Sequence, residues 1–160
     1  MKRILSIILL LLLLLVCLAL SSCSLPRTTA PKHGTFYVNA TGTTSQLYKG
    51  DASTGQKIVD AENSALWMSY GKGHAILDHA DSVCGDGVWN VNEMQVGGLA
   101  DLSVGGKKTY YECTAIWLCT QTRYVYKYNG QTISVKKGDI ICVSCADDPK
   151  YVYVAYYKRC

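Results

Sequence analysis

The chain has 160 residues, of which 49% are hydrophobic and 18% are charged, and its formal net charge is +4 at pH 7. This length suits one domain with enough chain to bury a core. The small net charge and the scattered lysines and arginines argue against a nucleic-acid-binding protein.

The first 22 residues are predicted to be a secretory signal peptide. Lys2 and Arg3 form a short positive start, residues 4–20 are almost entirely apolar, and Ser21 and Ser22 follow. This order of charged, apolar and small residues is typical of a signal that is cleaved during export. The apolar run is near the lower length limit of a membrane-spanning helix, so an uncleaved anchor stays an alternative.

Cys23 directly follows the two serines, in an order that resembles a bacterial lipobox. The resemblance implies that Cys23 receives a lipid, which would hold the domain at the extracytoplasmic face of the bacterial cell membrane. Ordinary cleavage nearby, with Cys23 a spare thiol, is the alternative. Residues 24–33 hold two of the three prolines, so residues 23–33 are predicted to be a tether and residues 34–160 the folded domain.

Beyond the tether the chain is predicted to be mainly β-structure. Short runs rich in Tyr, Val, Ile and Thr are punctuated by Gly and Asn. These runs are residues 35–40, 65–70, 74–78, 108–119, 122–128, 131–135, 139–145 and 151–157. Asn129-Gly130 is a hairpin signal, and residues 87–102 have room for a short helix that glycines interrupt. The pattern predicts a mainly antiparallel β-barrel or sandwich with one or two short helices.

Cysteines are frequent in the predicted domain, and an even number in an exported protein suggests a disulfide framework. After Cys23 they are Cys84, Cys113, Cys119, Cys142, Cys145 and Cys160. The sequence does not fix how they pair.

Cys142 and Cys145 lie three positions apart in an apolar run. A thioredoxin-type pair begins a helix that lowers its thiol pKa, whereas this pair is followed by Ala-Asp-Asp-Pro and another β-rich run. In a strand the two side chains point to opposite faces, so they are not expected to bond to each other. A zinc site needs a second ligand pair at short spacing, and none is present, so neither a metal nor another cofactor is expected.

Two interpretations of Cys145 remain, a disulfide partner and a nucleophile. A cysteine nucleophile needs a nearby base or acid. Of the three histidines, His33 lies in the predicted tether, His74 begins the run 74–78 and His79 follows it. A histidine at a strand end can face a cleft, so His79 is the candidate partner. A solvated turn histidine is the alternative.

Four segments, taken in order, resemble the sortase family. Residues 58–80 resemble the stretch that leads down a strand to the catalytic histidine, and residues 87–98 resemble the segment with a short helix and a Val-Gly turn. Residues 108–117 are similar to the long strand that follows, and residues 141–145, Ile-Cys-Val-Ser-Cys, to the strand that ends in the nucleophile. The separation between His79 and Cys145 is close to the usual one in that family.

The resemblance implies an extracytoplasmic cysteine transpeptidase on an eight-stranded, sortase-like antiparallel β-barrel. Such enzymes cut a peptide sorting signal in a surface protein and pass it to an amine acceptor. Cys145 would attack the scissile carbonyl and form a thioester. His79 would be the general acid for the leaving amine and then the base for the incoming one. With water as the acceptor, the same chemistry makes a thiol protease.

The sequence departs from the family at its third catalytic position. Lys150 stands where the family has an arginine at the start of the next strand, and a lysine cannot make a planar two-pronged contact. If Cys145 is a free nucleophile, one other cysteine must be unpaired, and Cys142 is then expected in the core or paired, for instance with Cys113. The competing interpretation is a non-catalytic, disulfide-stabilised surface lipoprotein that binds a partner.

Overall fold

The computed structural model describes residues 28–61, 64–80 and 91–160. Its elements are β1 (Lys32–Val38), β2 (Thr43–Lys49), α2 (Gly55–Val59), β3 (Ser64–Tyr70), β4 (Gly73–Leu77), the 3₁₀ helix η1 (Val91–Glu93), β5 (Leu99–Val104), β6 (Lys107–Thr122), β7 (Val125–Tyr128), β8 (Gln131–Thr132), β9 (Ile140–Cys145) and β10 (Tyr151–Arg159). The predicted signal peptide 1–22 and Cys23 lie outside the described residues.

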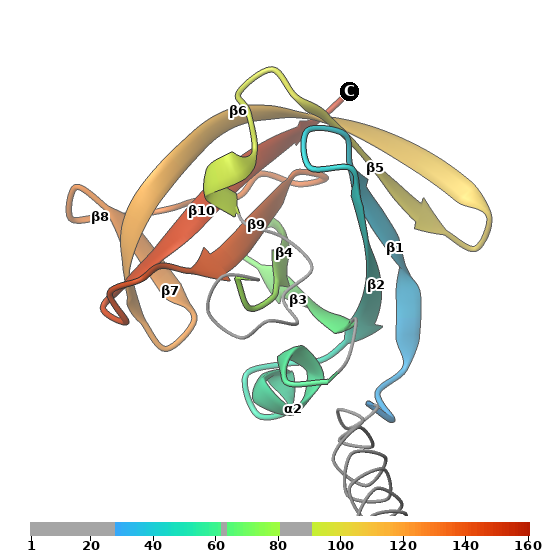
Figure 1. The fold of residues 1–160 in the computed structure, drawn as a ribbon, viewed down its shortest axis with the longest axis horizontal. Helices are drawn as coiled ribbons and strands as arrows, with labels where there is room; N and C mark the ends of the chain where they lie inside the picture. Colours follow the sequence, from blue (N-terminus) through green and yellow to red (C-terminus); the bar gives the residue numbers. More distant parts are fainter. Residues whose placement is uncertain (1–27, 62–63, 81–90) are drawn as a thin grey trace, which may run out of the picture.

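Eight strands of the described chain close into a barrel (Figure 1). Their order is β10-β9-β4-β3-β2-β1-β5-β6, and β6 pairs back onto β10. β7 and β8 extend the sheet beyond β6. The predicted mainly β-barrel is therefore confirmed, but two of its neighbouring pairs, β2–β3 and β4–β9, are parallel. Parallel neighbours need a crossover, and α2 lies in the crossover from β2 to β3.

Most predicted runs form strands, and the hairpin signal is confirmed. Tyr128 pairs with Gln131, and Asn129 and Gly130 both have positive φ, as a tight type I′ turn requires. Two strands were not predicted. β2 is polar along much of its length, and β5 begins inside the stretch considered for a helix. Both strands form because they pair with β1, one on each of its edges. The local sequence does not encode this pairing.

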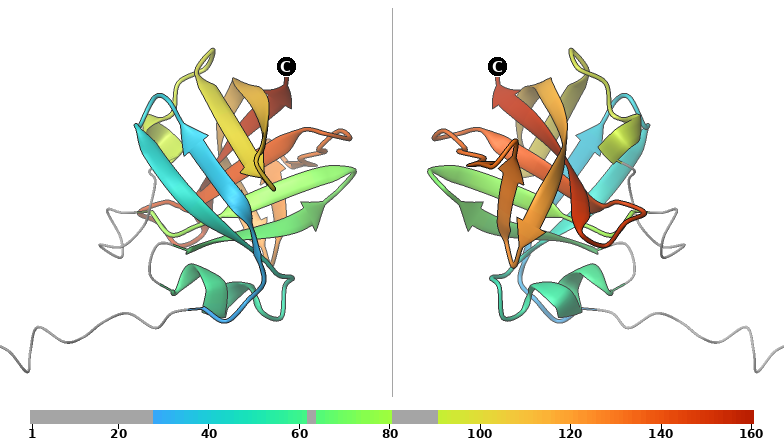
Figure 2. Two further views of the ribbon diagram at one scale, coloured as in Figure 1. Left: turned by 90° about the vertical axis from the view of Figure 1, so that its right-hand side faces the viewer. Right: turned by 90° about the vertical axis from the view of Figure 1, so that its left-hand side faces the viewer.

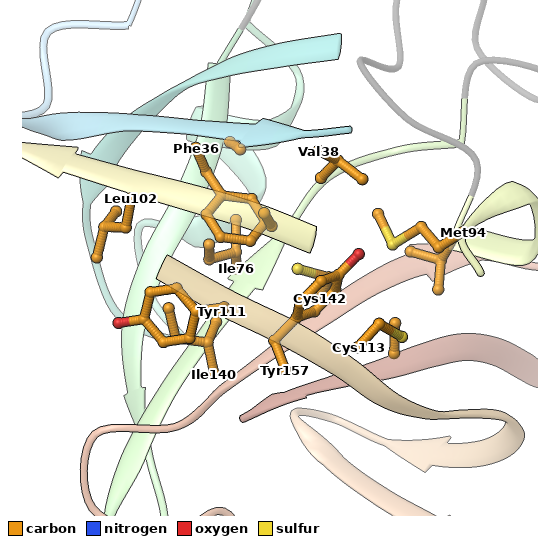
Figure 3. Close-up of a cluster of buried hydrophobic side chains, with 14 of the residues drawn as sticks. Phe36, Val38, Ile76, Met94, Leu102, Tyr111, Cys113, Ile140, Cys142 and Tyr157 are labelled. Atoms are coloured by element: carbon orange, nitrogen blue, oxygen red, sulfur yellow. The ribbon is translucent and has the colours of Figure 1, made fainter. Parts of the chain in front are cut away.

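One hydrophobic cluster fills the barrel interior (Figure 3). Phe36 is fully buried there, and its ring meets the rings of Tyr111 and Tyr157 edge to face, at centroid distances of 6.3 and 5.7 Å. Burying a side chain of this size contributes about 1.5–3 kcal/mol to folding. The other buried members are Val38, Leu47, Ala65, Trp67, Ile76, Val91, Met94, Ala100, Leu102, Cys113, Ile140, Cys142 and Ala155.

A second cluster, called here the outer cluster, forms on the other face of β4, β9 and β10. Successive side chains of β9 alternate between the two clusters. Ile140 and Cys142 lie in the interior cluster, and Ile141 and Val143 lie in the outer cluster. The outer cluster also takes in Ile58 of α2 and Tyr126 of β7, so α2 and the β7–β8 hairpin cover this face. Both side views show α2 at the end of the barrel opposite the C-terminus (Figure 2).

The first described residues run directly into the barrel. β1 begins at Lys32, and the ring of His33 stacks on Trp67 at a centroid distance of 4.4 Å. The ring of His74 stacks on Trp67 at the same distance. His33 was predicted to lie in the tether, yet it packs on the domain. Among the described residues, no helix is long and apolar enough to cross a membrane.

The predicted disulfide framework is not supported by the described part of the chain. Cys113, Cys119, Cys142, Cys145 and Cys160 are all free thiols, and Cys84 lies outside the described residues. The suggested Cys113–Cys142 bond is therefore not formed. Both side chains are fully buried in the interior cluster, and burial raises the pKa of each thiol. They act as small apolar core residues, which is the common role of a buried free cysteine.

Candidate active site

Cys145 and His79 are brought together by the parallel pairing of β4 with β9. Leu77 is the register partner of Val143, and Cys145 and His79 each lie two residues beyond that pair. The carboxyl ends of parallel strands meet at the same edge, so the two side chains arrive side by side. The Sγ atom of Cys145 lies 3.6 Å from Nδ1 of His79. The backbone N–H of Asp78 donates to the carbonyl of Val143 at 3.1 Å and locks the register just before the site.

Cys142 does not share this site. Its side chain is in the interior cluster, whereas that of Cys145 points to the opposite face and is half-buried. The expectation that the two thiols diverge along a strand is therefore correct. A redox pair made from them has no geometric basis in this fold.

The contact between Cys145 and His79 shifts the pKa of both groups. The hydrogen bond to Cys145 is the largest cause that raises the pKa of His79, to about 9; the bond to Asp60 adds to it, and burial opposes it. The hydrogen bond from His79 lowers the pKa of the Cys145 thiol, again against burial, and the backbone N–H of Ala80 contributes. Opposite charges at this distance stabilise each other. The contact therefore favours the thiolate–imidazolium form of the pair over two neutral groups.

Asp60, His79 and Cys145 form a row in which each side chain contacts the next. The Oδ1 atom of Asp60 lies 2.9 Å from Nε2 of His79, on the side of the ring away from Cys145. The same oxygen accepts a hydrogen bond of 2.8 Å from Nε2 of Gln56, one helical turn earlier. Asp60 lies at the C-terminal end of α2. The sequence analysis missed it, and no local signal identifies it, because its partner is 19 positions away, beyond β3 and β4.

A cavity of about 590 Å³ opens beside these groups. Its apolar wall comes from Val59, Leu66, Leu77, Val143 and Val152. Its remaining lining residues are Ala52, Ser53, Gly55, Gln56, Asp78, His79, Gln121, Arg123, Tyr124, Ser144 and Cys145. A hollow of this size, mostly apolar with a few convergent polar groups, is typical of a ligand site.

Gly55 lets α2 approach the turn between β6 and β7 closely. A Cβ atom at this position would lie 2.8 Å from Oη of Tyr124 and 2.7 Å from Cδ2 of Leu66. A larger residue would push α2 outward, away from the cavity. The glycine therefore helps to hold Asp60 and Gln56 at the cavity edge.

The predicted third residue, Lys150, is not among the residues that line the cavity. Lys150 is exposed in the turn between β9 and β10, where its backbone N–H donates to Asp148. Arg123, in the turn between β6 and β7, does line the cavity. Its φ of 50° is unusual for a residue with a side chain. Nothing in the local sequence marked Arg123, since its place at the cavity depends on how the β6–β7 turn packs.

Comparisons with known proteins give a consistent result at the level of the fold. No protein-family model matches the chain, and no curated protein does. Sortase C1 from Streptococcus suis is 10% identical, with 81% of this chain and 73% of that chain covered and a TM-score of 0.64. Sortase C from Streptococcus pneumoniae is 13% identical, with 83% and 70% covered and a TM-score of 0.60.

A structure of sortase C from Clostridium perfringens with the C-terminal cell wall sorting motif is also similar. It is 10% identical, with 82% of this chain and 71% of that chain covered and a TM-score of 0.60. At such low sequence identity, the similarity to these structures shows the fold alone. The closed eight-strand barrel, and the outer face that carries Cys145 and His79, thus form a domain with the sortase fold.

Proposed function

We propose that this protein is a sortase-type cysteine transpeptidase or protease with Cys145 as its nucleophile and His79 as its acid and base. The observation that carries the proposal is the 3.6 Å contact between these two side chains at the edge of a cavity on a sortase fold. The similar Clostridium perfringens sortase was solved with a cell wall sorting motif, which supports a peptide sorting signal as the substrate class.

The proposed reaction has two halves. The Cys145 thiolate attacks the scissile carbonyl carbon, the carbon–nitrogen bond breaks, and the imidazolium of His79 gives its proton to the leaving amine. The acyl part stays on Sγ as a thioester. An incoming amine, or water, then attacks the thioester and gives a proton to the neutral ring of His79 as the thiolate leaves. The second half restores the starting pair of charges.

Covalent trapping tests this proposal directly. The full-length chain in detergent would be incubated with peptides that carry candidate sorting motifs, and its intact mass measured. A gain equal to the acyl part of a peptide, mapped to Cys145, is the expected result. A chain that gains no mass, and whose Cys145 also resists alkylation without reduction, would be a binding protein instead.

A cation near the scissile bond would complete the proposed site. Order along the chain proposes Lys150, and Arg123 is the alternative because it lines the cavity. A charge-assisted hydrogen bond to substrate contributes about 1.5–3 kcal/mol, so Arg123→Ala is expected to lower kcat/KM by about 10- to 100-fold. Lys150→Ala is expected to change it less than about threefold. Both variants would be assayed on the same peptide, and the reverse order would assign the role to Lys150.

We also propose that the domain is exported and held at the extracytoplasmic face of the membrane by a lipid on Cys23. The order of charged, apolar and small residues before Cys23 supports export, as does a fold shared with sortases. The membrane-bound protein is expected to begin at Cys23 and to carry the added mass of acyl chains. Cys23→Ala should remove that mass, and a native protein that still begins at Met1 would contradict the assignment.

A further inference from the structure

Asp60 forms one of the two contacts that hold the ring of His79. Its carboxylate contacts one ring nitrogen of His79 at 2.9 Å, and the Cys145 thiol contacts the other at 3.6 Å. A histidine held at both nitrogens has one ring orientation and one preferred tautomer. When the N–H at Nε2 donates a hydrogen bond to Asp60, the lone pair on Nδ1 faces the thiol.

Asp60 is itself held in place by α2. Its backbone N–H donates to the carbonyl of Gln56 at 3.0 Å, and its Oδ1 accepts from the Gln56 side chain. Ile58, two residues before it in the helix, is buried in the outer cluster. The carboxylate is therefore presented to His79 from a fixed helix end.

We propose that Asp60 is a positioning residue that fixes the ring and tautomer of His79 so that Nδ1 takes the proton of Cys145. The proposal rests on the proposed function of the Cys145–His79 pair and adds a third member to it. In the step concerned, the S–H bond of Cys145 breaks and an N–H bond forms at Nδ1. The new imidazolium then donates from Nε2 to the Asp60 carboxylate, and no proton leaves the site.

Two other charged groups of the described residues, Asp78 and Arg123, line the same cavity as His79. Asp78, at the end of β4, accepts a hydrogen bond of 2.8 Å from the backbone N–H of His79 and so fixes the main chain. Arg123 lines the same cavity from the β6–β7 turn. Cys145 of β9 and Asp60 of α2 are the groups that meet the ring nitrogens.

The effect of Asp60 should appear in the titration of the thiol rather than in folding. The Asp60 side chain is 47% exposed, so its attraction to His79 is screened by water and contributes little to stability. Removing it nevertheless frees the ring to turn and removes a charge that favours the imidazolium. The apparent pKa of Cys145 should then rise.

The experiment measures the rate of iodoacetamide alkylation of Cys145 against pH in the full-length chain. Asp60→Ala is expected to move the midpoint up by about one pH unit, with alkylation about tenfold slower below it. Asp60→Asn keeps an oxygen acceptor but loses the charge, so an intermediate shift is expected. Asp101→Asn is the matched control, because Asp101 also forms an ion pair, with Lys108, but none with His79.

An unchanged midpoint in Asp60→Ala or in the isosteric Asp60→Asn, with circular dichroism like that of the wild type, would overturn the proposal. So would an equal shift in Asp101→Asn, which would show a general charge effect. The measurement needs no peptide substrate. A chain with the expected shifts that never forms an acyl-enzyme would therefore refute the proposed function and leave the role of Asp60 standing.

Discussion

Cys145→Ala is expected to abolish acyl-enzyme formation and to lower peptide cleavage by at least about 10³-fold, because Cys145 is the one thiol among the described residues that line the cavity. Cys142→Ala, three positions away, is expected to keep the activity. Its side chain is buried in the interior cluster, and replacing it removes one sulfur atom from the packing. A modest loss of stability, about 1–2 kcal/mol, should follow from the small cavity.

Peptide cleavage, intact mass and thermal unfolding, compared between the two variants, check this prediction. They separate an enzyme from a binding domain, since a binding role would tolerate Cys145→Ala and respond chiefly to loss of folding. Equal activity of both variants would rule out Cys145 as the nucleophile. If both variants were folded but inactive, the buried thiol of Cys142 would also be required for activity.

Activity is expected to follow a bell-shaped pH profile whose alkaline limb lies near pH 9. The hydrogen bond to Cys145 is the main cause that raises the pKa of His79 to about 9, and above that value the general acid is lost. The acid limb reflects protonation of the thiolate and lies below the ordinary pKa of a cysteine, because His79 lowers it. The two groups titrate as a pair, so both limbs belong to the pair.

The same shifts predict how this pair affects stability. The contribution of His79, whose pKa is raised from 6.5, is full below pH 6.5 and is lost as the pH rises through about 9. The contribution of Cys145, whose pKa is lowered, is full above its ordinary pKa and is lost as the pH falls through its folded value. Between the folded pKa of Cys145 and pH 9 the two contributions change in opposite directions, so the gain from Cys145 offsets the loss from His79 as the pH rises.

Rates of peptide cleavage and of Cys145 alkylation between pH 5 and 10.5 test the profile. His79→Ala should move the alkylation midpoint above the ordinary cysteine pKa, since burial then acts without its counterion, and slow alkylation at pH 7 about tenfold. His74→Ala is the matched control, because His74 stacks on Trp67 and is not among the residues that line the cavity. A wild-type midpoint at the ordinary cysteine pKa would show that the thiol is not activated.

The strand that follows the nucleophile presents an apolar residue to the cavity. Val152 is the register partner of Cys145 on β10 and lines the cavity with an apolar side chain. The family resemblance implies an arginine near the start of that strand. Arg123 reaches the same cavity from the β6–β7 turn. In the proposed site, Arg123 would therefore supply the positive charge from a different element than the one the resemblance implies.

Features that depend on near neighbours in the chain could be predicted from the sequence. Alternating β-branched and aromatic residues specified most strands, and Asn129-Gly130 specified a tight turn. The two-residue period of a strand predicted that Cys142 and Cys145 face opposite ways, as they do. The order of segments selected His79 and Cys145 as candidates.

The remaining features could not be predicted, because they depend on contacts between distant segments. The parallel register of β4 with β9 puts His79 beside Cys145, and β2 and β5 become strands by pairing with β1. The packing of α2 brings Asp60 to His79, and the packing of the β6–β7 turn brings Arg123 to the cavity. The count of cysteines suggested disulfides, yet the described thiols are free, since pairing depends on which side chains the barrel turns toward each other.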